Sequence, residues 1–173
     1  ITGASTEAMV SATTVESNTD GKSIGLNLWG ENKHYTDDLT VNVSGLGVNG
    51  NKYHNNVTGI YALDGTQVAI DKNVTVTVKN PAPAESGAKR RPDLAHYYMS
   101  GIYAGYGGLT SDGNNDDTRV TVKGNAKIDA VGVGLQANKD GYIRILGGAD
   151  VKTYPLDTSD TYSALSEEGF IYV

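Results

Sequence analysis

The sequence predicts an all-β protein whose chain winds into a parallel β-helix, a solenoid with three short strands in each of about five coils. Three observations support this fold class: a recurring Gly-Ile-Tyr-Ala type of segment, alternating β-branched runs after it, and Gly or Asn at the turns. Imperfect repeats of strand-like units are typical of solenoids, in which each coil needs neighbours to bury its core.

The Gly-Ile-Tyr-Ala segments are expected to form the first strand of each coil. Their aligned aliphatic positions are Ile24, Ile60, Ile102, Val133 and Ala164. Helical periodicity is nearly absent from the chain. An antiparallel sandwich also has short strands at regular spacing, but it gives no reason for one sequence to recur in every coil.

The alternating runs are expected to form the second strand of each coil, at residues 39–43, 67–70, 119–122, 142–145 and 170–173. Third strands are expected at residues 46–48, 74–78, 127–130 and 151–154. Because side chains alternate between the two faces of a strand, one set of aliphatic residues should point inward. This set is Val41, Val43, Val68, Ile70, Val120, Val122, Ile143 and Ile145.

Differences between the coils divide the chain into regions. Residues 1–22 are interpreted as an N-terminal cap or a first partial coil, and residues 23–173 as the β-helix. Inserted loops are expected at residues 31–38, 49–56, 81–98 and 107–117. Insertions in solenoids map to loops and often to the binding face.

Composition narrows the possible partners. The chain has 173 residues, a formal net charge of −6 and no cysteine. Nucleic acid is not an expected partner, because it requires a basic footprint. Direct membrane insertion is not expected either, since no apolar run approaches the ~20 residues that span a bilayer. The abrupt end in a strand-like segment indicates a fragment of a longer protein.

The rhythm GIYA … VTVTVKN … GIYA … VTVKGNAKIDA, across residues 23–173, resembles the passenger region of bacterial autotransporter adhesins. This resemblance implies a right-handed parallel β-helix at the extracellular surface of a Gram-negative cell. Most such passengers are adhesins or self-association modules, and some are proteases or esterases. The resemblance therefore implies a role in cell adhesion or biofilm formation.

No catalytic residues, metal site or cofactor are predicted. The three histidines, His34, His54 and His96, lie in expected insertions, and there is no Gly-x-Ser-x-Gly motif. The outward positions of the second strands offer no carboxylate pair for glycoside cleavage. Residues 112–117 have alternating oxygen ligands but lack the later ligands of a calcium loop, so an ordinary acidic turn is preferred.

Two groups of residues are predicted to bind a ligand or partner. Tyr61 and Tyr103 hold the same outward position in successive coils and could form a short aromatic ladder. The insertion at residues 81–98 has the Arg and Tyr content of an interface loop. Its candidate residues are Lys89, Arg90, Arg91, His96, Tyr97 and Tyr98. An exposed cluster of Tyr142, Arg144, Phe170 and Tyr172 is instead expected to pack against residues outside this chain.

The leading functional hypothesis is a non-enzymatic surface adhesin that contacts a host surface protein, a glycan or another cell. One alternative is a structural module that associates with another copy of itself through outward Thr and Asn ladders. A polysaccharide-degrading β-helix enzyme is the third hypothesis.

Overall fold

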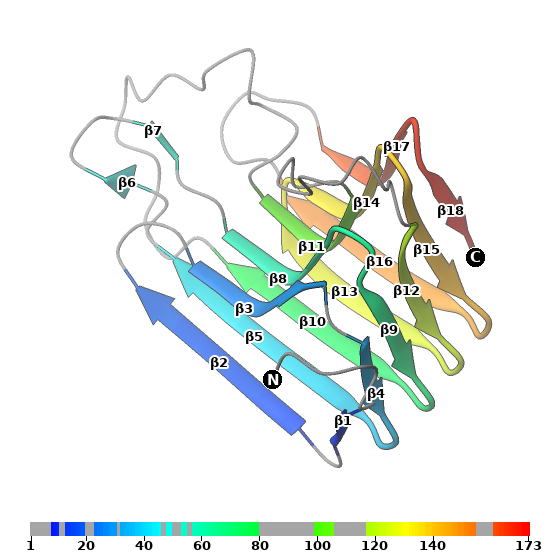
Figure 1. The fold of residues 1–173 in the computed structure, drawn as a ribbon. Helices are drawn as coiled ribbons and strands as arrows, with labels where there is room; N and C mark the ends of the chain where they lie inside the picture. The colour runs from blue at the N-terminus through cyan, green and yellow to red at the C-terminus, as the bar shows by residue number, and fades with distance from the viewer. Residues whose placement is uncertain are drawn as a thin grey trace.

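The computed structural model of the protein describes ten segments: residues 8–10, 13–19, 23–30, 32–45, 48–49, 53–54, 57–79, 99–105, 117–154 and 161–173. In these segments the chain is all β, with three parallel sheets that we call A, B and C (Figure 1). Within them, no helix is long and apolar enough to cross a membrane.

Sheet A has six strands: β1 (Ala8–Val10), β4 (Asn32–Tyr35), β9 (Gln67–Ile70), β12 (Thr118–Val122), β15 (Gly141–Ile145) and β18 (Phe170–Tyr172). Sheet B has five: β2 (Thr13–Thr19), β5 (Leu39–Gly45), β10 (Val74–Lys79), β13 (Ala126–Val131) and β16 (Ala149–Tyr154). Sheet C also has five: β3 (Ser23–Trp29), β8 (Val57–Leu63), β11 (Met99–Gly105), β14 (Val133–Asn138) and β17 (Tyr162–Glu167).

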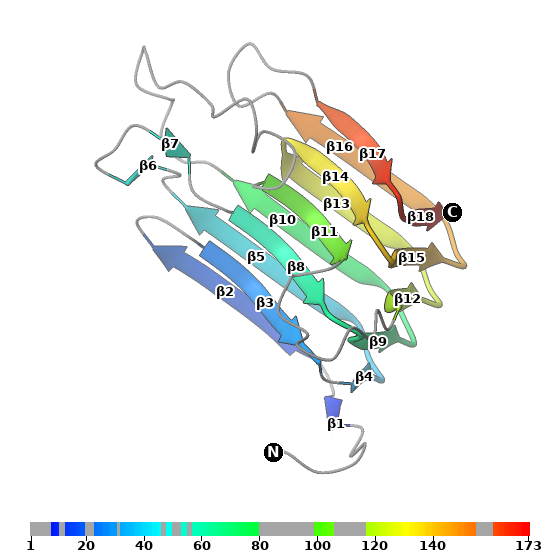
Figure 2. The ribbon, with the colours of Figure 1, turned by 45° about the horizontal axis from the view of Figure 1, so that its top comes forward.

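The chain visits the sheets in a fixed cycle, from C to A to B, and then returns to C beside the strand of the preceding coil. All neighbouring strands within sheets A, B and C pair in parallel, as for β8 with β11 and β9 with β12. Three stacked strand rows of this kind are consistent with the predicted parallel solenoid. In Figure 2, the rows of sheets B and C lie against each other, and the shorter strands of sheet A run along one side.

The buried core consists of aliphatic columns that run from coil to coil. All eight inward residues predicted from the alternating runs are at most 2% exposed, so their inward orientation is confirmed. Each such side chain contributes roughly 1.5–3 kcal/mol when it is removed from water. Sheet C adds a column formed by Ile60, Ile102 and Leu135, all buried.

The alignment of the first strands needs a correction of two residues in two coils. Leu26, not Ile24, pairs with Ile60, and Leu135, not Val133, pairs with Ile102. The correct alignment follows the glycine that directly precedes Leu26, Ile60, Ile102 and Leu135. A Cβ on Gly59 would lie 2.2 Å from Val76 Cγ1 in sheet B, so sheets B and C approach too closely there for a side chain.

The strand assignment of the first coil also needs correction. Residues 39–43 form part of β5, which pairs with β10, so this run belongs to the third row rather than the second. The second-row strand is β4, where Tyr35 pairs with Ile70 and is buried. Residues 31–38, expected to be an inserted loop, therefore contain a strand. Its Lys33-His34-Tyr35 sequence lacks the β-branched residues that identified the other strands.

The first described strands extend the same rows. β1 pairs with β4 in sheet A, and β2 pairs with β5 in sheet B. Within the expected insertion at 49–56, β7 (Tyr53–His54) pairs with β6 (Val48–Asn49) in antiparallel fashion. The expected loop 81–98 lies outside the described residues, as does most of 107–117.

Candidate binding face

The outward side of sheet A carries two columns of side chains, because alternate residues of each strand point away from the core. We call this surface the sheet A face. Its first column is Asn32, Gln67, Arg119, Tyr142 and Phe170. Its second column is His34, Ala69, Thr121, Arg144 and Tyr172. Asn42, expected in the second column, lies on sheet B instead.

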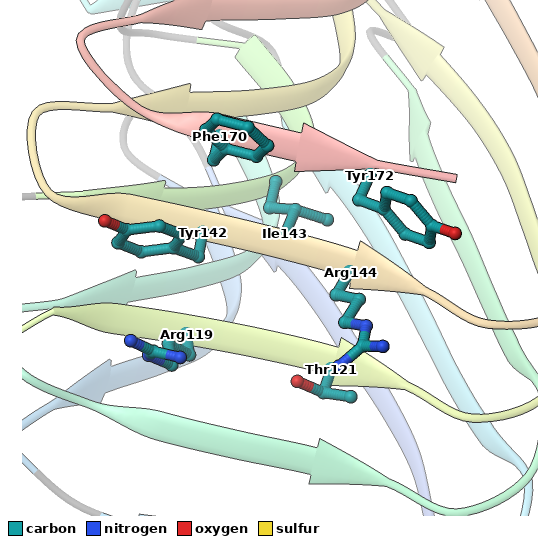
Figure 3. A pocket seen from close by; sticks show the side chains of 7 residues that line it. All are labelled: Arg119, Thr121, Tyr142, Ile143, Arg144, Phe170 and Tyr172. Atoms are coloured by element: carbon teal, nitrogen blue, oxygen red, sulfur yellow. The ribbon is translucent and has the colours of Figure 1, made fainter.

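Aromatic rings and arginines gather on this face at strands β12, β15 and β18 (Figure 3). The Tyr142 and Phe170 rings are stacked, with centroids 6.3 Å apart and planes 22° from parallel. Arg119 places its guanidinium carbon 4.9 Å from the centroid of Tyr142. The corresponding distance from Arg144 to Tyr172 is 5.8 Å. Cation–π contacts at such distances contribute roughly 0.5–1 kcal/mol at exposed sites.

These aromatic rings remain open to solvent although they contact one another. Phe170 is 63% exposed and Tyr172 is 57% exposed. Isolated surface aromatics need no explanation, but a contiguous apolar group rimmed by polar residues marks an interaction site. Two arginines beside three rings have the composition of a protein interface or ligand site.

The face is hollowed into two neighbouring grooves. One has a volume of about 390 Å³ and is lined by Arg119, Thr121, Tyr142, Ile143, Arg144, Phe170 and Tyr172. The second, of about 420 Å³, is lined by Asn32, Lys33, Gln67, Val68, Ala69, Arg119 and Thr121. Arg119 and Thr121 line both grooves, so the hollow runs across several coils.

Arg119 is held in place by its neighbours. Its Nη2 forms an ion pair with Asp117 Oδ2 at 2.5 Å. The Gln67 side-chain amide donates to the Asp117 carbonyl oxygen, which ties the preceding coil to the same position. Arg144 differs, because it forms no ion pair with any described residue. Its guanidinium is therefore the free positive charge of the sheet A face.

His34 lies at the other end of the second column and is tied to its neighbouring coils. His34 Nε2 lies 2.8 Å from Asp71 Oδ2, and Lys123 Nζ lies 2.7 Å from Asp71 Oδ1. A hydrogen bond with Lys123, and to a smaller extent one with His34, lowers the pKa of Asp71 below its ordinary value. His34 and Lys123 come from the coils on either side of Asp71, and each contacts one oxygen of its carboxylate. The cluster therefore links three successive coils.

The predicted tyrosine ladder exists. Tyr61 and Tyr103 pair in register, with ring centroids 4.9 Å apart and planes tilted by 36°. Their neighbours in the column are Asn27 and Gln136. Tyr103 is only 3% exposed, so its ring has almost no surface to offer a ligand. Binding through this ladder stays a prediction, with Tyr61 as its accessible member.

The other predicted contact residues cannot be compared with the sheet A face. Lys89, Arg90, Arg91, His96, Tyr97 and Tyr98 lie outside the described residues, and so does most of the acidic segment 112–117. Metal-ligating side chains do not cluster in groups of three or more anywhere in the described part of the chain.

Sequence reasoning identified part of the sheet A face but missed its extent. The cluster of Tyr142, Arg144, Phe170 and Tyr172 was expected as packing surface, whereas Arg119 and Gln67 were not singled out. Register was the missing signal, because the pairing of β9, β12 and β15 places Gln67, Arg119 and Tyr142 in one column.

Comparisons of the chain with protein-family models, with curated proteins and with solved structures gave no match.

Proposed function

We propose that this protein is a non-enzymatic binding module of the adhesin kind, which contacts its partner through the sheet A face. The observation that carries the proposal is the group of Arg119, Tyr142, Arg144, Phe170 and Tyr172, which lines one groove of the sheet A face. Arg and Tyr are enriched among the residues that dominate binding energy in interfaces.

The scaffold suits such a role. The outward side chains stand on strands whose opposite faces are fully buried, as with Val120 and Ile143. Sites built on strands hold their side chains more precisely than sites on loops. A rigid surface binds without a large cost in conformational ordering.

The absence of paired acids supports a binding role rather than glycoside cleavage. Canonical glycoside hydrolysis requires two carboxyl groups that flank the scissile bond. None of the ten positions of the sheet A face is Asp or Glu. We therefore propose contact without chemistry, with a host surface protein or a glycan as the partner at the extracellular bacterial surface.

The finer description of the fold is part of this proposal. We propose a right-handed β-helix with three strands per coil and about five coils. The repeated C-to-A-to-B cycle supports three strands per coil. Right-handed connections between parallel strands are strongly preferred in proteins, which supports the handedness.

A paired substitution tests the binding role of the face. The Phe170→Ala, Tyr172→Ala double variant removes two exposed rings without disturbing the buried core. We expect it to lose most adhesion to cells or to an immobilised glycan panel. Tyr154→Ala is the matched control, because Tyr154 is 46% exposed on sheet B. Equal adhesion by the double variant and the control would contradict the proposal.

The loop at residues 81–98 is a second proposed contact, supported by its Arg and Tyr content. Replacing Lys89, Arg90 and Arg91 with Ala should weaken adhesion further if the loop contributes. Unchanged adhesion by this triple variant would limit contact to the sheet A face.

A second candidate function is self-association through sheet B. Its outward side carries a square of alternating charges, in which Lys127 pairs in register with Asp150 and Asp129 with Lys152. None of these four residues forms an ion pair within the described chain. A two-fold axis parallel to the face would oppose each lysine to a partner's aspartate, so the square is complementary to itself.

Analytical ultracentrifugation distinguishes this candidate. The Lys127→Glu, Lys152→Glu variant should be monomeric, as should the Asp129→Lys, Asp150→Lys variant, because each square then repels its own copy. An equimolar mixture of the two variants should associate. A wild-type protein that stays monomeric at high concentration would exclude self-association through this square, with circular dichroism as the control for folding.

A further inference from the structure

We infer that the ligand of the sheet A face is an anionic carbohydrate polymer whose sugar carboxylates bind Arg144. This inference rests on the proposed binding function and names the chemistry of the ligand. Three features of the face carry it: its local charge, the arrangement of its rings and the shape of its hollow.

The charge of the face opposes that of the whole molecule. The chain carries a formal net charge of −6, yet none of the ten positions of the sheet A face is Asp or Glu. Asp117 neutralises Arg119, so the uncompensated positive charge on these ten positions is the guanidinium of Arg144. Arg144 is exposed and lacks a described ion-pair partner. Its planar guanidinium matches a carboxylate in a bidentate geometry, which an ammonium group cannot do. The free charge on the face therefore favours a carboxylated ligand.

The rings supply a second contact of a different kind. Tyr142 and Phe170 form a nearly parallel stack along one column, and Tyr172 lies in the neighbouring column beside Arg144. A sugar ring has an apolar face of C–H groups and a polar rim of hydroxyls. Exposed aromatic rings can cover the apolar face, while Thr121 offers a hydroxyl group to the rim.

The hollow is elongated rather than closed. The two grooves of about 390 and 420 Å³ meet at Arg119 and Thr121 and follow the stacking direction of the coils. Successive strands lie ~4.8 Å apart, so the face presents its contacts at regular intervals to an extended chain. An extended polymer fits this elongated hollow better than a single sugar does.

Direct binding measurements test the ligand class. Oligogalacturonate carries one carboxylate per sugar, and its methyl ester is the same chain without the charge. By isothermal calorimetry at low salt, we expect oligogalacturonate to bind at least about tenfold more tightly than the ester. Added salt should weaken the binding of oligogalacturonate, because exposed charges are screened.

Variants locate the site. Arg144→Gln removes the free charge and keeps most of the side-chain length, so oligogalacturonate affinity should fall by about tenfold or more. Lys79→Gln, which removes an exposed charge from β10 of sheet B, should leave the affinity unchanged. An equal loss in both variants would show that only the overall charge matters and would overturn the inference.

The outcomes separate the inference from the proposed function. Equal binding of oligogalacturonate and its ester overturns the anionic ligand but leaves a carbohydrate-binding face. Adhesion to cells that depends on Phe170 and Tyr172, with no carbohydrate bound, overturns the inference in favour of a protein partner. A wild-type protein that neither adheres to cells nor binds carbohydrate would overturn the inference and the proposed function together.

Discussion

Glycine has a packing role at one position in four of the five strands of sheet C, at Gly25, Gly59, Gly101 and Gly134. A Cβ on Gly59, Gly101 or Gly134 would lie between 2.2 and 2.5 Å from a sheet B side chain. The same Cβ would also lie 2.5 or 2.6 Å from a carbonyl oxygen of the next coil. Both neighbours are fixed, since one is in the core and the other is backbone. These glycines therefore allow the two sheets to approach each other.

Substituting one of these glycines should be costly. Gly59→Ala is expected to lower the free energy of unfolding by about 1–3 kcal/mol or more, through overpacking against Val76. Gly148→Ala is the control, because the nearest atom to its Cβ would be Asn125 Oδ1 at an ordinary 3.6 Å. Urea denaturation measures both variants. Similar stabilities for the two would show that sheets B and C are free to separate locally.

Asp71 makes stability depend on pH in one direction. Its pKa is lowered by hydrogen bonds from Lys123 and His34, so the folded protein binds its proton less readily than the unfolded chain does. The stabilisation is complete above the ordinary carboxyl pKa of about 3.9, and it is lost as the pH falls through the lower folded pKa.

The Asp71→Asn variant should therefore melt at a lower temperature than wild type at pH 7, and the difference should shrink below about pH 4. Thermal melts followed by circular dichroism give both values. Asp150→Asn serves as the control, since Asp150 has no described ion pair. A difference in melting temperature that persists unchanged in acid would assign the effect to packing rather than charge.

At the scale of single elements, the sequence predicted strands well where β-branched residues alternate and poorly where they do not. The runs that contain Val68, Val120 and Ile143 were placed correctly in one row. β4 was missed because Lys33 and Tyr35 occupy its inward positions. Tyr35 is nevertheless buried, and burial raises the pKa of its hydroxyl. Pairing with β9, rather than local propensity, makes this segment a strand.

The binding face was harder to predict than the core for a related reason. A two-residue alternation reveals which side chains point inward, but it does not reveal which outward side chains are neighbours. Arg119 and Tyr142 are 23 positions apart in the chain and become adjacent only through the register of β12 and β15. In the first coil, the strand of sheet A is β4 rather than β5. His34 therefore lies on the face, and Asn42 lies on sheet B.

Turns between sheets A and B are joined by a ladder of side chains. Asn73 donates to Asp38 Oδ1 through both its backbone N–H and its side-chain amide. The Asn73 side-chain oxygen accepts from the backbone N–H of Asn125, whose own side-chain oxygen accepts from Gly148. Each rung satisfies a backbone donor in the following coil, which holds the corners in register.

Breaking one rung should have a moderate effect. Asn73→Ala removes an acceptor and a donor, and it should lower the free energy of unfolding by about 1 kcal/mol. Asn27→Ala, at an exposed position whose side chain forms no hydrogen bond to described residues, is the control and should stay near wild type. Chemical denaturation compares them. A loss no larger than in the control would mean that water replaces the ladder without penalty.

The described strands form a stack in which each coil pairs with the coils next to it, so the cost of a cavity should depend on the position of the coil. Ile143 and Ile171 occupy successive positions of one inward column of sheet A and differ in burial. Ile143 is 1% exposed, with neighbours on both sides, whereas Ile171 is only partly buried on β18. The same side chain thus faces two different surroundings in one protein.

Truncating these two residues tests whether the stability of the solenoid depends on contacts between neighbouring coils. Ile143→Ala should lower the free energy of unfolding by about 2–5 kcal/mol, because the surrounding columns cannot collapse into the cavity. Ile171→Ala should cost clearly less, since solvent already reaches part of its side chain. Equilibrium denaturation gives both losses, and native-state hydrogen exchange reports where the chain opens. Equal losses would contradict a stack of nearest-neighbour coils and favour a single undivided core.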